Sequence, residues 1–225
     1  MTTAQAWLSD RLGYRFSDPA LFDRALTHRS APGQSNERLE YLGDAVLDAV
    51  VSDVLYHAFP DADEGDLSRL RAHLVRDASL SDLAMELQLG DHIALGSGEQ
   101  KSGGHRRQSI LADALEAIFG AVYLDAGFEA ARDVIRRAYG DRLRDFPALD
   151  ALKDPKTRLQ EWLQSRGLKL PEYRLVETTG KAHNQQFSVS CRVDGKDLDV
   201  EGTGSSRRNA EQRAAERMLE KLLSS

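Results

Sequence analysis

The sequence predicts an all-α domain followed by a small α+β domain with the element order αβββα. Helical apolar periodicity runs through the first half, and no convincing strand precedes about residue 170. Three strand-like runs and a last helix then follow within about 70 residues. We therefore divide the chain into a helical domain over residues 1–147, a linker over 148–153 and a small α+β domain over 154–225.

Helix boundaries in the first half are indicated by capping residues, prolines and glycines. An Asp-Pro pair can begin a helix, because the carboxylate caps the first N–H groups and proline fits the first turn. Glycine readily adopts the conformation that ends a helix. These signals predict helix starts at Asp18-Pro19 and within 79–82, a helix over 65–75, and stops at Gly13, Gly90 and Gly127.

The small domain begins after a change in composition, where Pro147 and Pro155 interrupt the periodicity. Asp154 can cap a helix whose first residue is Pro155. The remaining predicted elements are strands at 172–179, 185–193 and 196–200, a turn at Asp194-Gly195, a glycine loop over 202–206 and a helix through 207–215.

Charge is distributed unevenly along the chain. The whole chain has 30 Lys+Arg and 36 Asp+Glu, a net charge of −6. Residues 1–150 contain 16 basic and 25 acidic residues, a net charge of −9, whereas residues 151–225 contain 14 and 11, a net charge of +3. This division favours a metal site in the first half and a polyanionic partner for the second.

Two features predict a cytoplasmic protein with no membrane partner. No apolar run approaches the length of a membrane span, and the N-terminus lacks the basic start and apolar stretch of a secretory signal. Cys191 is the single cysteine and cannot form an internal disulfide, which fits a reducing compartment. Alternate residues around it are apolar, so we interpret it as an inert core thiol.

Acidic side chains recur at helical spacing in two segments of the helical domain. Glu37, Glu40 and Asp44 are three and four residues apart, which places them on one helical face. Asp113 and Glu116 are three apart in a segment of otherwise apolar and small residues. Desolvated like charges are costly unless a cation neutralises them. Oxygen-only ligands suit Mg²⁺, with Mn²⁺ as a substitute, so we predict a divalent metal site.

Other interpretations of these acids are weaker. A solvated helix face is the usual reason for such spacing, but small residues flank Asp44 and the second acidic pair, which would let two helices approach closely around an ion. Arg38 could pair with one carboxylate but cannot neutralise five. A four-helix di-iron site needs Glu-x-x-His pairs, and no histidine lies three residues after any of these acids.

The start of the last predicted helix is a candidate phosphate-binding surface. The glycine loop over 202–206 precedes Arg207 and Arg208; N–H groups at a helix start favour phosphate, and each guanidinium adds a charge-assisted bond. A dinucleotide-binding loop fails as an alternative, because the final glycine is absent and the preceding strand belongs to an antiparallel hairpin. A merely solvated helix start is the second alternative.

Histidines and one further loop give weaker signals. His183 lies in a predicted hairpin loop beside Lys181 and Asn184, a mixture suited to ribose hydroxyls, although a lone loop histidine more often has no role. Segment 102–107 is either a phosphate-contacting loop or simply a loop. The other histidines lack ligand spacing, and we assign them no chemistry: His28, His57, His73, His92 and His105.

Residues 36–47 resemble the signature of the ribonuclease III endonucleases, and Asp113 with Glu116 match that family's second acidic pair. The C-terminal 70 or so residues resemble a double-stranded RNA-binding domain, through 157–164, the His183 loop and 202–215. The resemblance covers nearly the whole chain. It implies an all-α endonuclease domain followed by a small α+β (αβββα) double-stranded RNA-binding domain.

The resemblance also implies roles for single residues. Three of the acids would bind the catalytic Mg²⁺ directly. Asp44 would hold the waters of the ion and help to position the nucleophile, and Tyr41 would lie at a dimer contact. The implied metal ligands are Glu40, Asp113 and Glu116, and the implied catalytic carboxylates are Asp44, Glu116, Glu37 and Glu64.

The implied RNA-binding residues are Thr157, Gln160, His183, Arg207 and Arg208. One departure concerns the last helix, since generic domains of this kind tend to have a lysine where this chain has Glu211. Asn209 adds no charge either, so phosphate affinity would rest mainly on the two arginines.

The implied activity is metal-dependent hydrolysis of double-stranded RNA to 5′-phosphate and 3′-hydroxyl ends. Staggered cuts in both strands would need two active sites, which a homodimer supplies most simply. The family resemblance suggests roles in ribosomal RNA precursor and mRNA processing. Two alternatives are a duplex-RNA-binding scaffold whose helical half only dimerises and a DNA nuclease, the latter disfavoured because the small domain suits A-form grooves.

Overall fold

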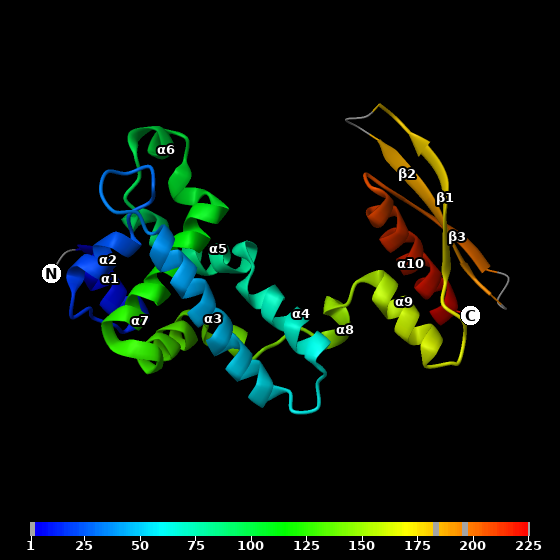
Figure 1. Cartoon of the computed structure of the whole chain (residues 1–225), viewed down its shortest axis with the longest axis horizontal. Helices are drawn as coiled ribbons and strands as arrows, with labels where there is room; N and C mark the ends of the chain where they lie inside the picture. Colours follow the sequence, from blue (N-terminus) through cyan, green and yellow to red (C-terminus); the bar gives the residue numbers. More distant parts are fainter. Residues whose placement is uncertain (1–2, 182–184, 195–197, 225) are drawn as a thin grey trace. The chain divides into compact units, whose positions relative to one another are not determined.

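The structure, a computed structural model, describes residues 3–181, 185–194 and 198–224 (Figure 1). The chain divides into two compact units, Met1–Pro147 and Ala148–Ser225. Each unit has its own core. None of the helices described is both long and apolar enough to span a lipid bilayer.

The first unit is helical, and its core lies between the two longest helices, α3 and α7. Figure 1 shows these helices crossing in the middle of the unit, and their mutual contact is the most extensive in it. Leu47 and Val50 of α3 and Leu115, Ile118 and Phe119 of α7 are completely buried. The elements are α1 (Thr3–Leu12), α2 (Pro19–Ala25), α3 (Glu37–Ala58), α4 (Glu64–Val75), α5 (Asp77–Glu86), η1 (Leu89–His92), α6 (Ser97–Lys101), η2 (Gly104–Arg106), α7 (Gln108–Tyr139) and η3 (Gly140–Leu143).

Several predicted helix boundaries are confirmed. Asp18 caps α2, and its Oδ1 accepts a hydrogen bond from the N–H of Ala20 at 3.0 Å. Gly13 follows α1 directly and has a φ of 66°, the left-handed conformation that ends many helices. The helix predicted over 65–75 is α4, which begins one residue earlier.

Three other boundary predictions were wrong or incomplete. The helix expected to start within 79–82 begins at Asp77. Gly90 does not end a helix but lies inside η1, where a Cβ atom would come 2.2 Å from the carbonyl oxygen of His105. Gly127 does interrupt the helical conformation as predicted, with φ 82° and ψ −176°; the prediction was incomplete because a second helical segment of α7 follows this kink and runs to Tyr139.

The second unit is a three-stranded antiparallel sheet with two helices packed on one face, so the predicted αβββα order is confirmed. Cys191 pairs with Tyr173 on one side and Val200 on the other, and its buried thiol lies in the core as predicted. Figure 1 shows α10 against the sheet. The elements are α8 (Leu149–Leu152), which lies within the predicted linker, α9 (Pro155–Gln164), β1 (Glu172–Thr179), β2 (Gln186–Val193), β3 (Leu198–Gly204) and α10 (Arg207–Leu223).

The prediction of a flexible glycine loop over 202–206 was wrong. Gly202 and Gly204 belong to β3, and α10 packs directly on them. A Cβ atom on Gly202 would lie 2.3 Å from the backbone nitrogen of Ala214, and one on Gly204 would lie 2.7 Å from that of Ala210. These glycines therefore permit close helix–sheet packing and do not provide a flexible phosphate loop. The predicted turn residue Gly195 lies outside the described residues.

Candidate metal centre and nucleic-acid interface

The candidate metal centre is built where α3 and α7 cross at close range. A Cβ atom on Gly43 of α3 would come 1.8 Å from the carbonyl oxygen of Glu116, and one on Gly120 of α7 would come 2.2 Å from that of Leu39. Both glycines are buried. The two backbones can touch here because neither position has a side chain, and acids one turn away on each helix are thereby brought together.

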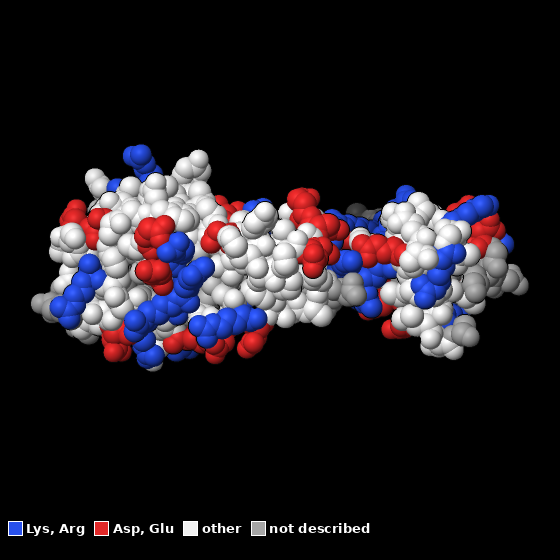
Figure 2. All heavy atoms as spheres, turned by 90° about the horizontal axis from the view of Figure 1, so that it is seen from below, with Lys and Arg blue, Asp and Glu red and all other residues white. Residues whose placement is uncertain are grey.

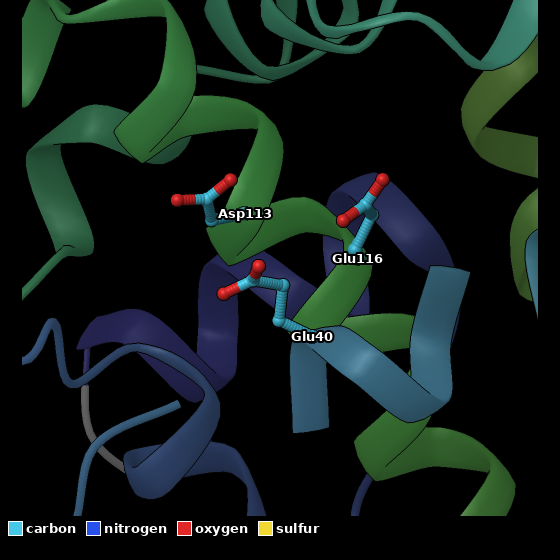
Figure 3. Close-up of side chains that lie close together, drawn as sticks. All are labelled: Glu40, Asp113 and Glu116. Carbon is cyan, nitrogen blue, oxygen red and sulfur yellow. The ribbon is translucent and has the colours of Figure 1, made fainter. Parts of the chain in front are cut away.

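Glu40, Asp113 and Glu116 meet at this crossing. Each offers one carboxylate oxygen, and the three oxygens lie within 4.8 Å of one another. Figure 3 shows Glu40 on α3 beside Asp113 and Glu116 on α7. All three side chains are partly buried. The structure therefore brings the three predicted metal ligands together from two helices.

Without a cation, three ionised carboxylates at this crossing would be electrostatically unfavourable. Burial, with repulsion from Asp44, Asp113 and Glu40, raises the pKa of Glu116 from 4.5 to about 8. Burial also raises the pKa of Glu40 and of Asp113, with repulsion between neighbouring acids as the next cause. A divalent cation would remove this penalty, because it favours the ionised form of every carboxylate.

The donor set fits a hard divalent ion. All three side chains supply oxygen, and the group contains no thiolate or imidazole. Mg²⁺ and Mn²⁺ prefer such ligands and retain several waters when bound by a few carboxylates. Among the described residues Arg38 forms no ion pair, so it does not neutralise the cluster instead.

A cavity of about 380 Å³ opens beside the acids and mixes positive and negative groups. Arg29 is exposed and lies 3.6 Å from Glu37, and Arg107 forms an ion pair of 2.6 Å with Glu99. Glu40 and Asp113 also line the cavity, which therefore adjoins the metal centre. The lining residues are His28, Arg29, Asn36, Glu37, Glu40, Glu99, Arg107, Ser109, Ile110 and Asp113.

Asp44, Glu37 and Glu64 differ in how they relate to the three acids. Asp44 is exposed on α3 and close enough to Glu116 to raise its pKa. Glu37 lies at the cavity and accepts a hydrogen bond from Ser35 Oγ at 2.8 Å. Glu64 lies apart from the acids, at the start of α4, where it accepts a hydrogen bond from Ser68 Oγ at 2.8 Å.

Sequence reasoning missed three residues of this site. Asp77, the first residue of α5, raises the pKa of both Asp113 and Glu116. His28, assigned no chemistry above, and Arg29 favour the ionised form of Asp113. All three are distant in sequence from the acids they affect, and only the packing of the helices brings them near.

The candidate RNA-binding residues of the second unit cluster at the adjoining starts of α9 and α10. Asp154 caps α9 and accepts a hydrogen bond from Gln212 Nε2 of α10 at 2.9 Å, which ties the two helix starts together. Thr157 is partly buried and its Oγ1 donates to Asp154 at 2.9 Å. Gln160, Arg207 and Arg208 are exposed, whereas His183 lies outside the described residues.

Charge on the surface is mixed. Figure 2 shows lysines and arginines interspersed with acids on the face drawn, and neither unit presents an unbroken surface of one sign there. Ser206 caps α10 by accepting from the N–H of Asn209 at 3.2 Å, so the helix start is ordered before any ligand binds. Arg207 and Arg208 are exposed cations at this helix start, where a phosphate could meet them.

Both units resemble known proteins. Residues 18–143 match a family model described as Ribonuclease-III-like, and residues 155–222 match the double-stranded RNA binding motif. Ribonuclease 3 of Alkalilimnicola ehrlichii is 54% identical over 99% of this chain and 97% of that protein. Ribonuclease 3 of Vibrio cholerae is 53% identical over 99% of both chains.

Two solved structures from Campylobacter jejuni resemble the first unit, and both are of the nuclease domain of ribonuclease III. One has a TM-score of 0.59 and 46% identity, covering 62% of this chain and 97% of that chain. The other has a TM-score of 0.58 and 50% identity, covering 59% and 93%. The second was described for structural flexibility in a region involved in dimer formation.

Proposed function

Because this chain belongs to the ribonuclease III family, we propose that it is a divalent-metal-dependent endoribonuclease that hydrolyses double-stranded RNA. The observation that carries the proposal is the set of three carboxylate oxygens within 4.8 Å of one another at the α3–α7 crossing. The matching RNA-binding motif in the second unit supports the choice of substrate. Mg²⁺ would be the natural cofactor, with Mn²⁺ able to replace it.

We assign to Glu40, Asp113 and Glu116 the binding of the ion. Bound there, Mg²⁺ would lower the pKa of water and stabilise charge on the phosphoryl oxygens. We assign to Asp44, exposed beside Glu116, the orientation of the attacking water. Attack in line with the P–O3′ bond breaks that bond and leaves a 5′-phosphate and a 3′-hydroxyl.

Two further carboxylates are assigned on the family match. Glu37 lies at the cavity beside the acids, so it could contact the strand being cut. Glu64 would support the site, although no contact in the described chain joins it to the three acids. Its assignment therefore rests on the match alone.

Cleavage of both strands of duplex RNA would require two active sites and an extended binding surface on the protein. A homodimer would supply two active sites for staggered cleavage, with exposed Tyr41 of α3 at the contact. The second unit would bind duplex RNA by shape, over about 16 base pairs. Its contacts would come from Thr157, Gln160, His183, Arg207 and Arg208. Ribosomal RNA precursors and mRNA would be the cytoplasmic targets.

A cleavage assay on duplex RNA tests the proposal. The unmodified protein should cut with Mg²⁺ and fail to cut with a chelator. Glu116→Gln should bind the duplex as before and lose cleavage, because a neutral amide cannot replace the carboxylate at the ion. Glu216→Gln, an equal charge change at an exposed position of α10, should cut normally.

Each alternative has its own outcome in this assay. Binding without cleavage by the unmodified protein would indicate a scaffold. Equal cleavage of duplex DNA would contradict the choice of RNA, and equal cleavage by Glu116→Gln would contradict the assigned metal ligand.

A further inference from the structure

Glu211 joins the two helices at the RNA-binding end of the second unit. Its Oε2 accepts a hydrogen bond from Lys156 Nζ of α9 at 2.7 Å, and its Oε1 accepts one from Arg207 Nε of α10 at 3.0 Å. Only 15% of the Glu211 side chain is exposed. One carboxylate thus holds two cations where phosphate is expected to bind.

Lys156 has a second contact besides Glu211. Its ammonium lies 4.5 Å from the centre of the Tyr173 ring, and 34% of its side chain is exposed. Lys156 also lies one helical turn before Gln160, a candidate RNA-binding residue, so both point to the same side of α9. A lysine in this place would be expected to contact phosphate, yet its charge is already paired.

Arg207 is held differently. Glu211 engages only its Nε atom, and 60% of the side chain is exposed. Within the described chain, the two terminal nitrogens of this guanidinium have no hydrogen-bond partner, and they can therefore bind a phosphate in a bidentate manner. Glu211 thus orients Arg207 without using the atoms that phosphate needs.

We propose that Glu211 sets the duplex-RNA affinity of the second unit, by withholding Lys156 from phosphate while it presents Arg207. The proposal rests on the proposed function, since it assumes that these helix starts bind RNA. A phosphate near Lys156 would have to displace a carboxylate that also repels it. The protein therefore binds RNA less tightly than its cations would allow, and it releases a cleaved duplex sooner.

Equilibrium binding of Glu211→Gln to a duplex RNA tests this, with the full-length protein, a chelator to prevent cleavage and a range of salt concentrations. Glutamine keeps an oxygen that can accept from Arg207 Nε, but it no longer neutralises Lys156. We expect several-fold tighter binding at low salt and a log–log salt dependence that is steeper by about one unit, because one more phosphate contact forms. Glu216→Gln is the matched control; it lies on the same helix, is exposed and forms no ion pair with any described residue. It should bind like the unmodified protein.

A double-mutant cycle with Lys156→Met identifies the released cation. Methionine keeps an apolar side chain against Tyr173, so thermal unfolding should show a folded domain. Lys156→Met alone should change binding little, and it should abolish the gain produced by Glu211→Gln. A gain that persists without Lys156 would overturn the proposal, because general repulsion would then explain it.

Two further results would also overturn it. Unchanged or weaker binding by Glu211→Gln, with unchanged thermal stability, would show that the carboxylate only positions its cations or only bridges the helices. If the unmodified protein itself failed to bind duplex RNA, the proposed function would fall together with this inference, whereas normal binding without a Glu211 effect would overturn the inference alone.

Discussion

Glu116 is the residue whose charge depends most on what occupies the α3–α7 crossing. Its carboxyl is surrounded by Asp44, Asp113 and Glu40, and without a cation its pKa is about 8. In the metal-free protein Glu116 should therefore keep its proton near neutral pH, and this protonation can be measured. It also provides a way to test the site that does not depend on cleavage.

We expect the metal-free protein to lose stability as pH rises from about 4.5 to about 8. Over this window folded Glu116 keeps a proton that the unfolded chain has released, so the folded state binds more protons and the free energy of unfolding falls with rising pH. Thermal unfolding in a chelator across this range measures the effect. Glu116→Gln should flatten the decline and Glu216→Gln should not.

Excess Mg²⁺ gives the complementary measurement. Because the ion displaces the proton, it should stabilise the protein more at the alkaline end of the window than at the acidic end. A decline with the same slope in Glu116→Gln and in the unmodified protein would contradict the environment assigned to this carboxyl.

At the scale of elements, the metal centre depends on how closely α3 and α7 approach. The acids lie on two different helices, so the spacing of the helix backbones sets the spacing of the carboxylates. Gly43 and Gly120 each face backbone of the opposite helix, where nothing flexible can yield to a new side chain. The crossing is therefore as much part of the site as the acids are.

Gly43→Ala should destabilise the fold by about 1–3 kcal/mol and weaken Mg²⁺ binding, because the methyl group must push the helices apart. Chemical denaturation and calorimetric titration with Mg²⁺ measure the two effects. Gly98→Ala is the matched control, since a Cβ atom on Gly98 meets nothing within 4 Å. Metal affinity that is unchanged in Gly43→Ala would show that the crossing does not position the acids.

The elements also show what the sequence could and could not predict. Local signals predicted the caps of α2 and α9 well, because Asp18 and Asp154 contact only the first turn that follows them. Gly202 was misassigned to a loop, since the packing partner that requires a glycine is α10, which no local pattern shows. The acids Asp113 and Glu116 were recognised by their spacing, whereas Asp77 joins the site only through tertiary packing.

At the scale of the whole molecule, the chain combines an acidic nuclease unit with a weakly basic RNA-binding unit. Residues 1–150 carry a net charge of −9, which repels a polyanion, and residues 151–225 carry only +3. RNA affinity must therefore come from a small number of placed cations and not from the overall field. Arg207 and Arg208 are exposed at the start of α10, and the N–H groups of a helix start also favour phosphate.

Replacing Arg207 and Arg208 together by alanine should weaken duplex-RNA binding and reduce its log–log salt dependence by up to about two units, if each arginine contacts one phosphate. Filter binding or fluorescence anisotropy over a salt series, in a chelator, gives the slope. The matched control is Arg174→Ala with Arg192→Ala, which removes the same charge from exposed strand positions. Both control residues point to the sheet face opposite the buried Cys191 side, away from α9 and α10. Equal slopes for the two double variants would mean that net charge, and not the start of α10, governs RNA binding.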